Sequence, residues 1–219
     1  MKWAYVIAVI IILFKALAIP NPTAELSGIS IVESIVQDSG VSNAVSGIIF
    51  RNRLYDTIFE VVVFSIAILG AGFLLSDENP AIVYQLSDRP SIVLARLGAT
   101  ITAIISIELA IRGHLSPGGG FAAGVAGGTA IGLIAIVSSS EKMEAIYKNL
   151  RAAVWEKVSV LIFILLAVVT LIGYEIPDGQ LGTLFSGGAI PLLNILVAIK
   201  VALGSWAAVL YFIRYRGLL

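Results

Sequence analysis

The feature that constrains this chain most is a series of long apolar runs, several of which approach the ~20 residues that a helix needs to cross a bilayer. Of the 219 residues, 58% are hydrophobic and only 13% are charged. A soluble domain usually carries about 25% charged residues. A chain in contact with lipid must satisfy its backbone hydrogen bonds internally, so the runs are expected to be helices. The sequence therefore predicts an all-α, polytopic membrane protein.

Six runs are expected to form membrane spans, at about 4–19, 57–75, 91–112, 119–137, 157–174 and 191–213. The first run begins like a signal peptide, because Lys2 precedes the apolar residues. However, Lys15 interrupts this run and no small-residue cleavage site follows it. We therefore expect the first run to remain in the chain as a span.

The basic residues of the loops are divided unequally between the two sides of the membrane. The side of the N-terminus collects Lys2, Arg89, Lys142, Lys148, Arg151, Lys157, Arg214 and Arg216. The opposite side collects only Arg51, Arg53 and Arg112. By the positive-inside rule, both termini are expected to lie in the cytoplasm, with residues 20–56 and the loop around His114 outside.

Two polar stretches divide the chain. In residues 29–57, apolar side chains recur at helical spacing on both sides of a break at Asp38-Ser39-Gly40. This pattern fits two short amphipathic helices at the outer interface, and it also fits a loop covered by protein. Residues 76–90 form the most polar stretch near the middle. We therefore expect a two-span module at 1–88 and a four-span module at 89–219.

Glycines gather in the segment RGHLSPGGGFAAGVAGGTAIG, residues 112–132. A phosphate-binding loop is excluded, because no lysine follows the glycines and the context is two membrane helices. Four of the glycines recur at every fourth residue and share one helix face: Gly120, Gly124, Gly128 and Gly132. Such a face lets a neighbouring helix approach closely in lipid. We expect these glycines to build a tightly packed hairpin of the third and fourth spans.

Metal and cofactor sites find little support in the composition. The chain contains no cysteine and a single histidine, His114. Disulfides and cysteine-ligated clusters within the chain are thereby excluded, and His114 has no second nitrogen donor with which to hold zinc. The net charge of zero gives no indication of nucleic-acid binding. We expect no cofactor and no metal.

Ionisable residues inside or beside spans are costly and mark either a buried pair or an ion pathway. The candidates are Asp56, Glu60, Glu108, His114 and Lys200. Asp56 and Glu60 share a helix face, and Lys200 lies near mid-span, so it should face protein or water. Glu108 lies one turn before Arg112, and a structural pair and a transport role both remain open. His114 fits either a proton relay with Glu108 or a residue that caps the hairpin.

Several segments carry a family resemblance. RPSIVLARLGA, RGHLSPGGGFAAGV and GGAIPLLNILVAIKVALG resemble the MrpB (MnhB) component of the multi-subunit Mrp-type cation/proton antiporters, over roughly 89–219. Residues 39–70 resemble the C-terminal part of the MrpA component, through Asn-x-Val, Arg-x-Tyr-Asp-Thr and the glutamate that follows. The chain thus resembles a fusion of two pieces. This layout is similar to the Mrp-like modules of archaeal respiratory complexes, including membrane-bound hydrogenases and related reductases.

The resemblance implies a membrane subunit that contributes to Na⁺/H⁺ movement beside other subunits, without being an enzyme itself. The family pattern falls on Asp56, Thr57, Glu60, His114, Ser116, Pro117 and the glycines 118–120, with Lys200 in the closing helix. Ala122 and Ala123 replace the polar or glycine residues usual in the family. The long broken helices of the main proton pumps are absent, so the chain is not expected to be a complete antiporter. A structural scaffold and a small self-sufficient transporter remain as alternatives.

Overall fold

The computed structural model describes residues 30–80, 85–174 and 176–216. The chain divides into two units, Met1–Ile31 and Val32–Leu219. Of the first unit only Ser30 and Ile31 are described, so the expected span at 4–19, with Lys15, lies outside the described residues. Everything that follows concerns the second unit together with these two residues.

All regular structure in the described residues is helical, as the apolar runs predict. The elements are α2 (Ile31–Ser39), α3 (Ala44–Gly47), the π-helical segment η1 (Ile48–Asn52), α4 (Leu54–Leu75), α5 (Arg89–Arg112), α6 (Gly119–Ala135), α7 (Ser140–Asn149), α8 (Ala152–Leu171) and α9 (Ile190–Arg216). Four helices are long and apolar enough to cross a membrane: α4, α5, α8 and α9. The helix α6 is a shorter apolar helix. Five of the six expected spans therefore correspond to helices.

Capping residues set where several of these helices begin. Asp88 precedes α5 and accepts a hydrogen bond from the backbone N–H of Ser91 at 3.0 Å, with Pro90 in the first turn. Asn43 precedes α3 and accepts hydrogen bonds from the N–H groups of Val45 and Ser46. Such side-chain oxygens satisfy N–H groups that have no partner inside the helix. The helix starts are therefore encoded locally.

The segment between residues 29 and 57 combines both of the expected alternatives. Its described part is largely helical, and α2 ends at Ser39, just before Gly40, whose φ of +66° is a conformation that suits glycine. Beyond the break, Val41 is completely buried, whereas Ile31 and Val45 remain well exposed. The segment thus consists of short helices that are partly covered by protein. Its location at a membrane interface stays a prediction.

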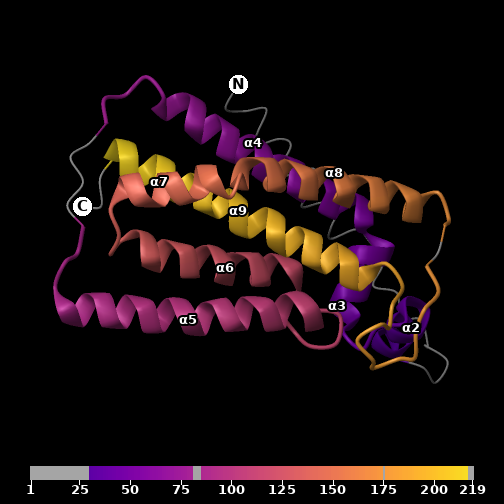
Figure 1. The fold of residues 1–219 in the computed structure, drawn as a ribbon. Helices are drawn as coiled ribbons and strands as arrows, with labels where there is room; N and C mark the ends of the chain where they lie inside the picture. The colour runs from indigo at the N-terminus through magenta and orange to yellow at the C-terminus, as the bar shows by residue number, and fades with distance from the viewer. Residues whose placement is uncertain (1–29, 81–84, 175, 217–219) are drawn as a thin grey trace, which may run out of the picture. The chain divides into compact units, whose positions relative to one another are not determined.

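The helix α9 is the central element of the second unit. It contacts α4, α5, α6 and α8 along its length, and α6 lies between α5 and α9 (Figure 1). One apolar cluster joins α9 to α4 and α8 and contains Phe163 and Leu193. A second cluster joins α9 to α6 and α7 and contains Met143 and Trp206. Side chains from several spans therefore converge on α9.

The glycine face of α6 packs against α9. A Cβ atom added at Gly120, Gly124 or Gly128 would lie only 2.3, 2.4 or 2.6 Å from the nearest atom of α9. These distances are shorter than any van der Waals contact, so the two helices meet at backbone distance. At Gly132 the nearest atom, on Val209, would be 3.9 Å away, which is an ordinary contact. The close-packing prediction holds for three of the four glycines.

The predicted partner of this face is corrected. We expected the third span, α5, but α5 contacts a different side of α6. There the Ser106 hydroxyl donates a hydrogen bond to the Ala123 carbonyl at 2.7 Å. Gly127 lies on the same side, and a Cβ on it would be 2.9 Å from the Ser106 oxygen. A spacing of four residues defines one face of a helix, but it does not say which neighbour that face meets.

The second unit has two ends, which we name by the helix that marks each. At the α3 end, α3 meets the 113–118 loop, because the Asn43 N–H donates to the His114 carbonyl at 3.1 Å. At the α7 end, α7 meets the last turns of α9, where Arg214 contacts Glu144 at 3.3 Å. The spans alternate between these ends, as the predicted topology requires (Figure 1).

Candidate functional site

A hydrogen-bond network at the α3 end holds the loop between α5 and α6. The Asn43 side-chain amide donates to the carbonyls of Gly113 and Ser116, both at 2.8 Å. The Ser46 hydroxyl also donates to the Gly113 carbonyl, at 2.9 Å. The α3 segment therefore fixes a loop some 70 residues away in the sequence. The two predicted modules are joined here by specific polar contacts.

His114 is buried inside this network. Its side chain is completely inaccessible, and its Nε2 atom faces the Thr183 carbonyl at 3.4 Å. Burial lowers the pKa of His114 below 6.5, and the contacts with the backbone of Thr183 and Leu184 oppose that shift only in part. The histidine is therefore held as a neutral ring that ties the 113–118 loop to the loop before α9.

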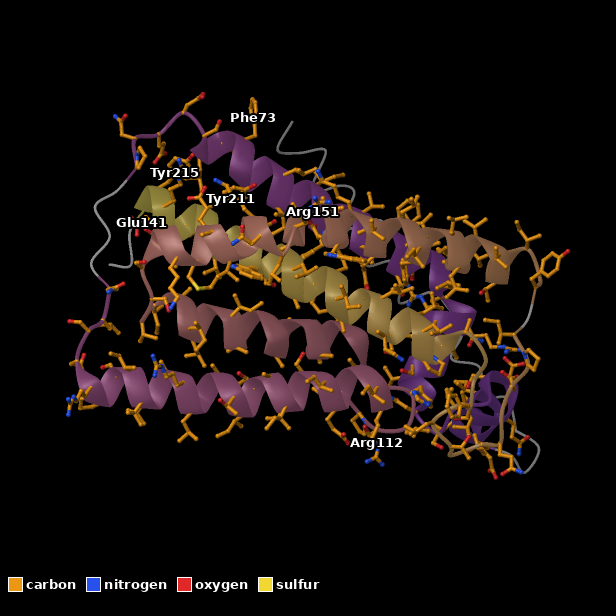
Figure 2. All side chains as sticks on the ribbon, in the orientation of Figure 1. Phe73, Arg112, Glu141, Arg151, Tyr211 and Tyr215 are labelled. Carbon is orange, nitrogen blue, oxygen red and sulfur yellow. The ribbon has the colours of Figure 1, made fainter. Side chains whose placement is uncertain are left out.

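Glu108 has a different partner. Its carboxylate accepts a hydrogen bond from Arg112 at 3.0 Å, and both side chains are more than half exposed. Figure 2 shows Arg112 directed away from the helices. Within the described residues, no hydrogen bond or ion pair joins Glu108 to His114. The geometry favours the structural alternative for both residues.

A pocket of about 210 Å³ opens at the α3 end, and we call it the Glu60 pocket. It is lined by Asn43, Val45, Ser46, Ile49, Phe50, Thr57, Glu60, Pro117, Gly118, Gly119, Gly120, Phe121 and Val197. Glu60 is the one ionisable residue in this lining. Asp56 is not part of it, because Arg53 binds the Asp56 carboxylate through Nε at 2.6 Å. The structure thus brings Glu60 together with the glycine loop, but not with Asp56.

Lys200 forms a buried ion pair with Glu156 of α8. Only 1% of the Lys200 side chain and 12% of the Glu156 side chain are exposed. The prediction that Lys200 faces protein or water is confirmed, and its surroundings are protein. A lone charge at the centre of a membrane helix costs about 2.5–3.5 kcal/mol on insertion scales, so each member of the pair compensates the other.

Glu156 is the residue that sequence reasoning missed. We expected the fifth span to begin at 157, which leaves Glu156 in a loop, but α8 begins at Ala152. The four basic residues between 142 and 157 made this stretch look like a solvent-exposed loop. A signal was available in the four apolar residues Ala152-Ala153-Val154-Trp155, which extend the run to the N-terminal side of Glu156.

The α7 end carries a second cleft, of about 470 Å³. It is lined by Pro80, Ser140, Glu141, Glu144, Tyr147, Lys148, Ala207, Leu210, Tyr211 and Arg214. Figure 2 shows Glu141 and Tyr211 at this end. Lys148, which donates to Glu144 at 2.7 Å, lowers the pKa of the Glu144 carboxyl. Burial, together with the negative charge of Glu156, raises the pKa of Tyr147 to about 12.

Comparisons with known proteins give one family match and two similar solved structures. A profile described as a domain related to the MnhB subunit of Na⁺/H⁺ antiporter matches residues 90–207. A chain of the membrane-bound sulfane sulfur reductase, an archaeal respiratory membrane complex, has a similar structure with a TM-score of 0.67 and 24% identity. The match covers 97% of this chain and 98% of that chain. At this identity the likeness shows the fold alone.

A chain of the Mrp complex from Dietzia sp. DQ12-45-1b is also similar, with a TM-score of 0.63 and 20% identity. That match covers 96% of this chain but 25% of the longer one. No curated protein sequence matches the chain significantly. The family profile extends over more than half of the chain and contains the glycine loop, α6 and most of α9. This multi-pass membrane protein therefore belongs to the family of domains related to the MnhB subunit of Na⁺/H⁺ antiporter.

Proposed function

We propose that the chain is an integral membrane subunit of an Mrp-type ion-translocating complex and that it contributes to Na⁺/H⁺ movement. Its family membership and its likeness to chains of two such membrane complexes support this proposal. The protein itself does no redox chemistry and is not an enzyme, although the whole complex can be a redox-driven ion pump. Its partners are the other subunits and the lipid bilayer.

The layout of the chain is part of the proposal. Residues 1–88 correspond to the C-terminal part of the MrpA component, and residues 89–219 correspond to the MrpB component. The hydrogen bonds from Asn43 and Ser46 to Gly113 support a functional unit built across this boundary. The α7 end faces the cytoplasm, as do both termini. This orientation rests on the basic residues that the predicted topology assigns to that side, which include Lys142, Lys148, Arg151, Lys157 and Arg214.

The observation that carries the proposal is the buried Lys200–Glu156 pair. A purely structural helix would more cheaply carry leucine at both positions, because replacing a buried ion pair with apolar residues is often neutral or stabilising. The pair holds an ammonium donor against a carboxylate acceptor, and both lie away from water. Such a pair is suited to exchanging protons within the bilayer.

Glu60 completes the proposed path at the α3 end. Its carboxylate lies in a pocket that is open to the surroundings, where it can collect a cation or a proton. Val197 of α9 lines the same pocket, one helical turn before Lys200. The ion-collecting group, Glu60, and the proton-exchanging group, Lys200, therefore lie about one helical turn apart along two neighbouring helices.

The test compares Glu60→Gln and Lys200→Met in the purified whole complex. Lys157→Met is the matched control, because Lys157 is an exposed lysine at the start of the same span as Glu156. The content of subunits and sodium-dependent proton movement are measured separately in proteoliposomes. The proposal expects intact assembly with lost transport in Glu60→Gln and Lys200→Met, and normal transport in Lys157→Met. Undiminished transport in both test variants would leave the chain as a scaffold.

A further inference from the structure

Phe64 lies between the Glu60 pocket and the Lys200–Glu156 pair. On α4, Phe64 follows Glu60 by four residues, which is one helical turn. On α9, Lys200 follows the pocket residue Val197 by three residues. The two polar sites are therefore separated by about 5 Å of helix rise on each of these neighbouring helices. Any ion that moves between them must pass the side chains of this one turn.

Two aromatic rings fill that turn. The Phe64 ring centre lies 5.1 Å from the Lys200 ammonium nitrogen, in a cation–π contact. The same ring packs edge-to-face against Phe121, with centroids 6.1 Å apart and planes at 76°. Phe121 in turn lines the Glu60 pocket. The rings thus form a continuous apolar contact from the lining of the pocket to the ammonium group.

Gly204 of α9 makes room for the Phe64 ring. A Cβ atom on Gly204 would lie 2.7 Å from Cε1 of Phe64 and 3.5 Å from the Lys200 nitrogen. Any larger residue would displace the ring from its place beside the ammonium group. Phe64 also packs against the buried apolar cluster of α4, α8 and α9. The position of the ring is therefore held from several sides.

The surroundings of the pair differ toward the two ends. Toward the α7 end, Tyr147 packs edge-to-face against Trp206 and lines the open α7 cleft with Glu144, Lys148 and Arg214. Toward the α3 end, the Phe64 ring lies between the Lys200 ammonium and the pocket. The Phe64 ring is thus the group that separates the pair from the Glu60 pocket.

We propose that Phe64 is a barrier residue that closes the Lys200–Glu156 pair off from the Glu60 pocket, so that a proton passes between them only when the ring moves. Hydrophobic constrictions interrupt chains of water and act as gates in this way. The inference deepens the proposed function and rests on it. It assigns Phe64 a role in coupling, while Glu60 and Lys200 keep the role of carrying charge.

The test uses the whole complex in proteoliposomes, with proton leak measured in the absence of sodium. Phe64→Ala should raise the leak several-fold, and Phe64→Leu should raise it much less because leucine still fills the turn. Phe73→Ala is the matched control, since Phe73 lies on the same helix, is 78% exposed and points away from the bundle (Figure 2). Adding Lys200→Met to Phe64→Ala should abolish the extra leak.

The outcomes separate this inference from the function on which it rests. If Phe64→Ala leaves leak and coupling unchanged while Lys200→Met stops transport, the barrier is refuted and the proposed function stands. If none of the variants changes leak or transport, both are refuted. Extra leak in Phe64→Ala that disappears with Lys200→Met supports both.

A labelling experiment keeps the inference testable should Phe64→Ala fail to assemble. The chain has no natural cysteine, so single cysteines report on one position each. An impermeant thiol reagent added from the α3 side should label Val45→Cys, which is exposed in the pocket lining, but should not label Lys200→Cys behind Phe64. Equal labelling of both positions from that side, with Phe64 in place, would overturn the barrier.

Discussion

Replacing Gly124 with alanine should loosen the packing of α6 on α9. The new Cβ would lie 2.4 Å from the Val201 Cβ and 2.8 Å from the Ala198 carbonyl oxygen. The carbonyl belongs to the α9 backbone and cannot rotate away, so the helices must separate by roughly 1 Å to restore van der Waals distance. Overpacking of this kind costs about 1–3 kcal/mol. Gly132 offers the matched control, because a Cβ there would meet its nearest neighbour at 3.9 Å.

The assay is the thermal stability and yield of the complex that contains each variant, followed by fluorescence-detected size exclusion. We expect Gly124→Ala to lower the unfolding midpoint clearly. Gly132→Ala should leave it unchanged or raise it slightly, because alanine favours a helix over glycine by up to about 1 kcal/mol. Equal effects of the two substitutions would refute the claim that the glycine face determines the approach of α6 to α9.

Three further predictions concern the contacts at the two ends. Asn43→Ala removes two hydrogen bonds to the 113–118 loop as well as the cap of α3, so we expect a loss of about 1–3 kcal/mol in a thermal-unfolding comparison with Ser42→Ala. Burial lowers the pKa of His114, so the folded state favours the neutral ring. Stability should therefore be constant above pH 6.5 and fall as the pH drops below it. His114→Asn should remove this part of the decline when unfolding midpoints are measured across pH. Ala145→Cys, on an exposed position of α7, should react with an impermeant reagent only from the cytoplasmic side, and labelling of intact cells would reverse the proposed orientation.

The spans were predictable because length and hydropathy determine them directly. Four of the five described apolar helices begin and end within three residues of the predicted limits, whereas α8 begins five residues before its predicted start. The helix α7 was not predicted, because its exposed Lys142 and Lys148 are typical of a loop. Arg151, with a φ of +50°, separates α7 from α8 and gives no signal in the sequence. Local composition thus predicts where helices cross the membrane better than it predicts short helices between them.

Individual residues of the candidate site were predictable from the sequence, but the contacts between them were not. The depth of Lys200 in its span indicated a protein environment, and the structure confirms it. Its partner Glu156 lies 44 residues away in the sequence, on a helix whose start was misplaced. The role of Gly204 in seating Phe64 depends on how α4 and α9 pack, and a single glycine in an apolar run does not indicate this. Tertiary packing brings these residues together, and the spacing of residues within one helix does not encode that packing.

The most direct test of the account is the double substitution Lys200→Met with Glu156→Leu. Removing one partner alone leaves an unpaired buried charge and costs about 3–5 kcal/mol, whereas replacing both with apolar residues is often neutral for stability. The double variant therefore separates a transport role from a structural one. We predict that the complex assembles normally and loses sodium-dependent proton movement in proteoliposomes. Normal assembly together with normal transport would contradict the claim that the buried pair of this protein carries protons.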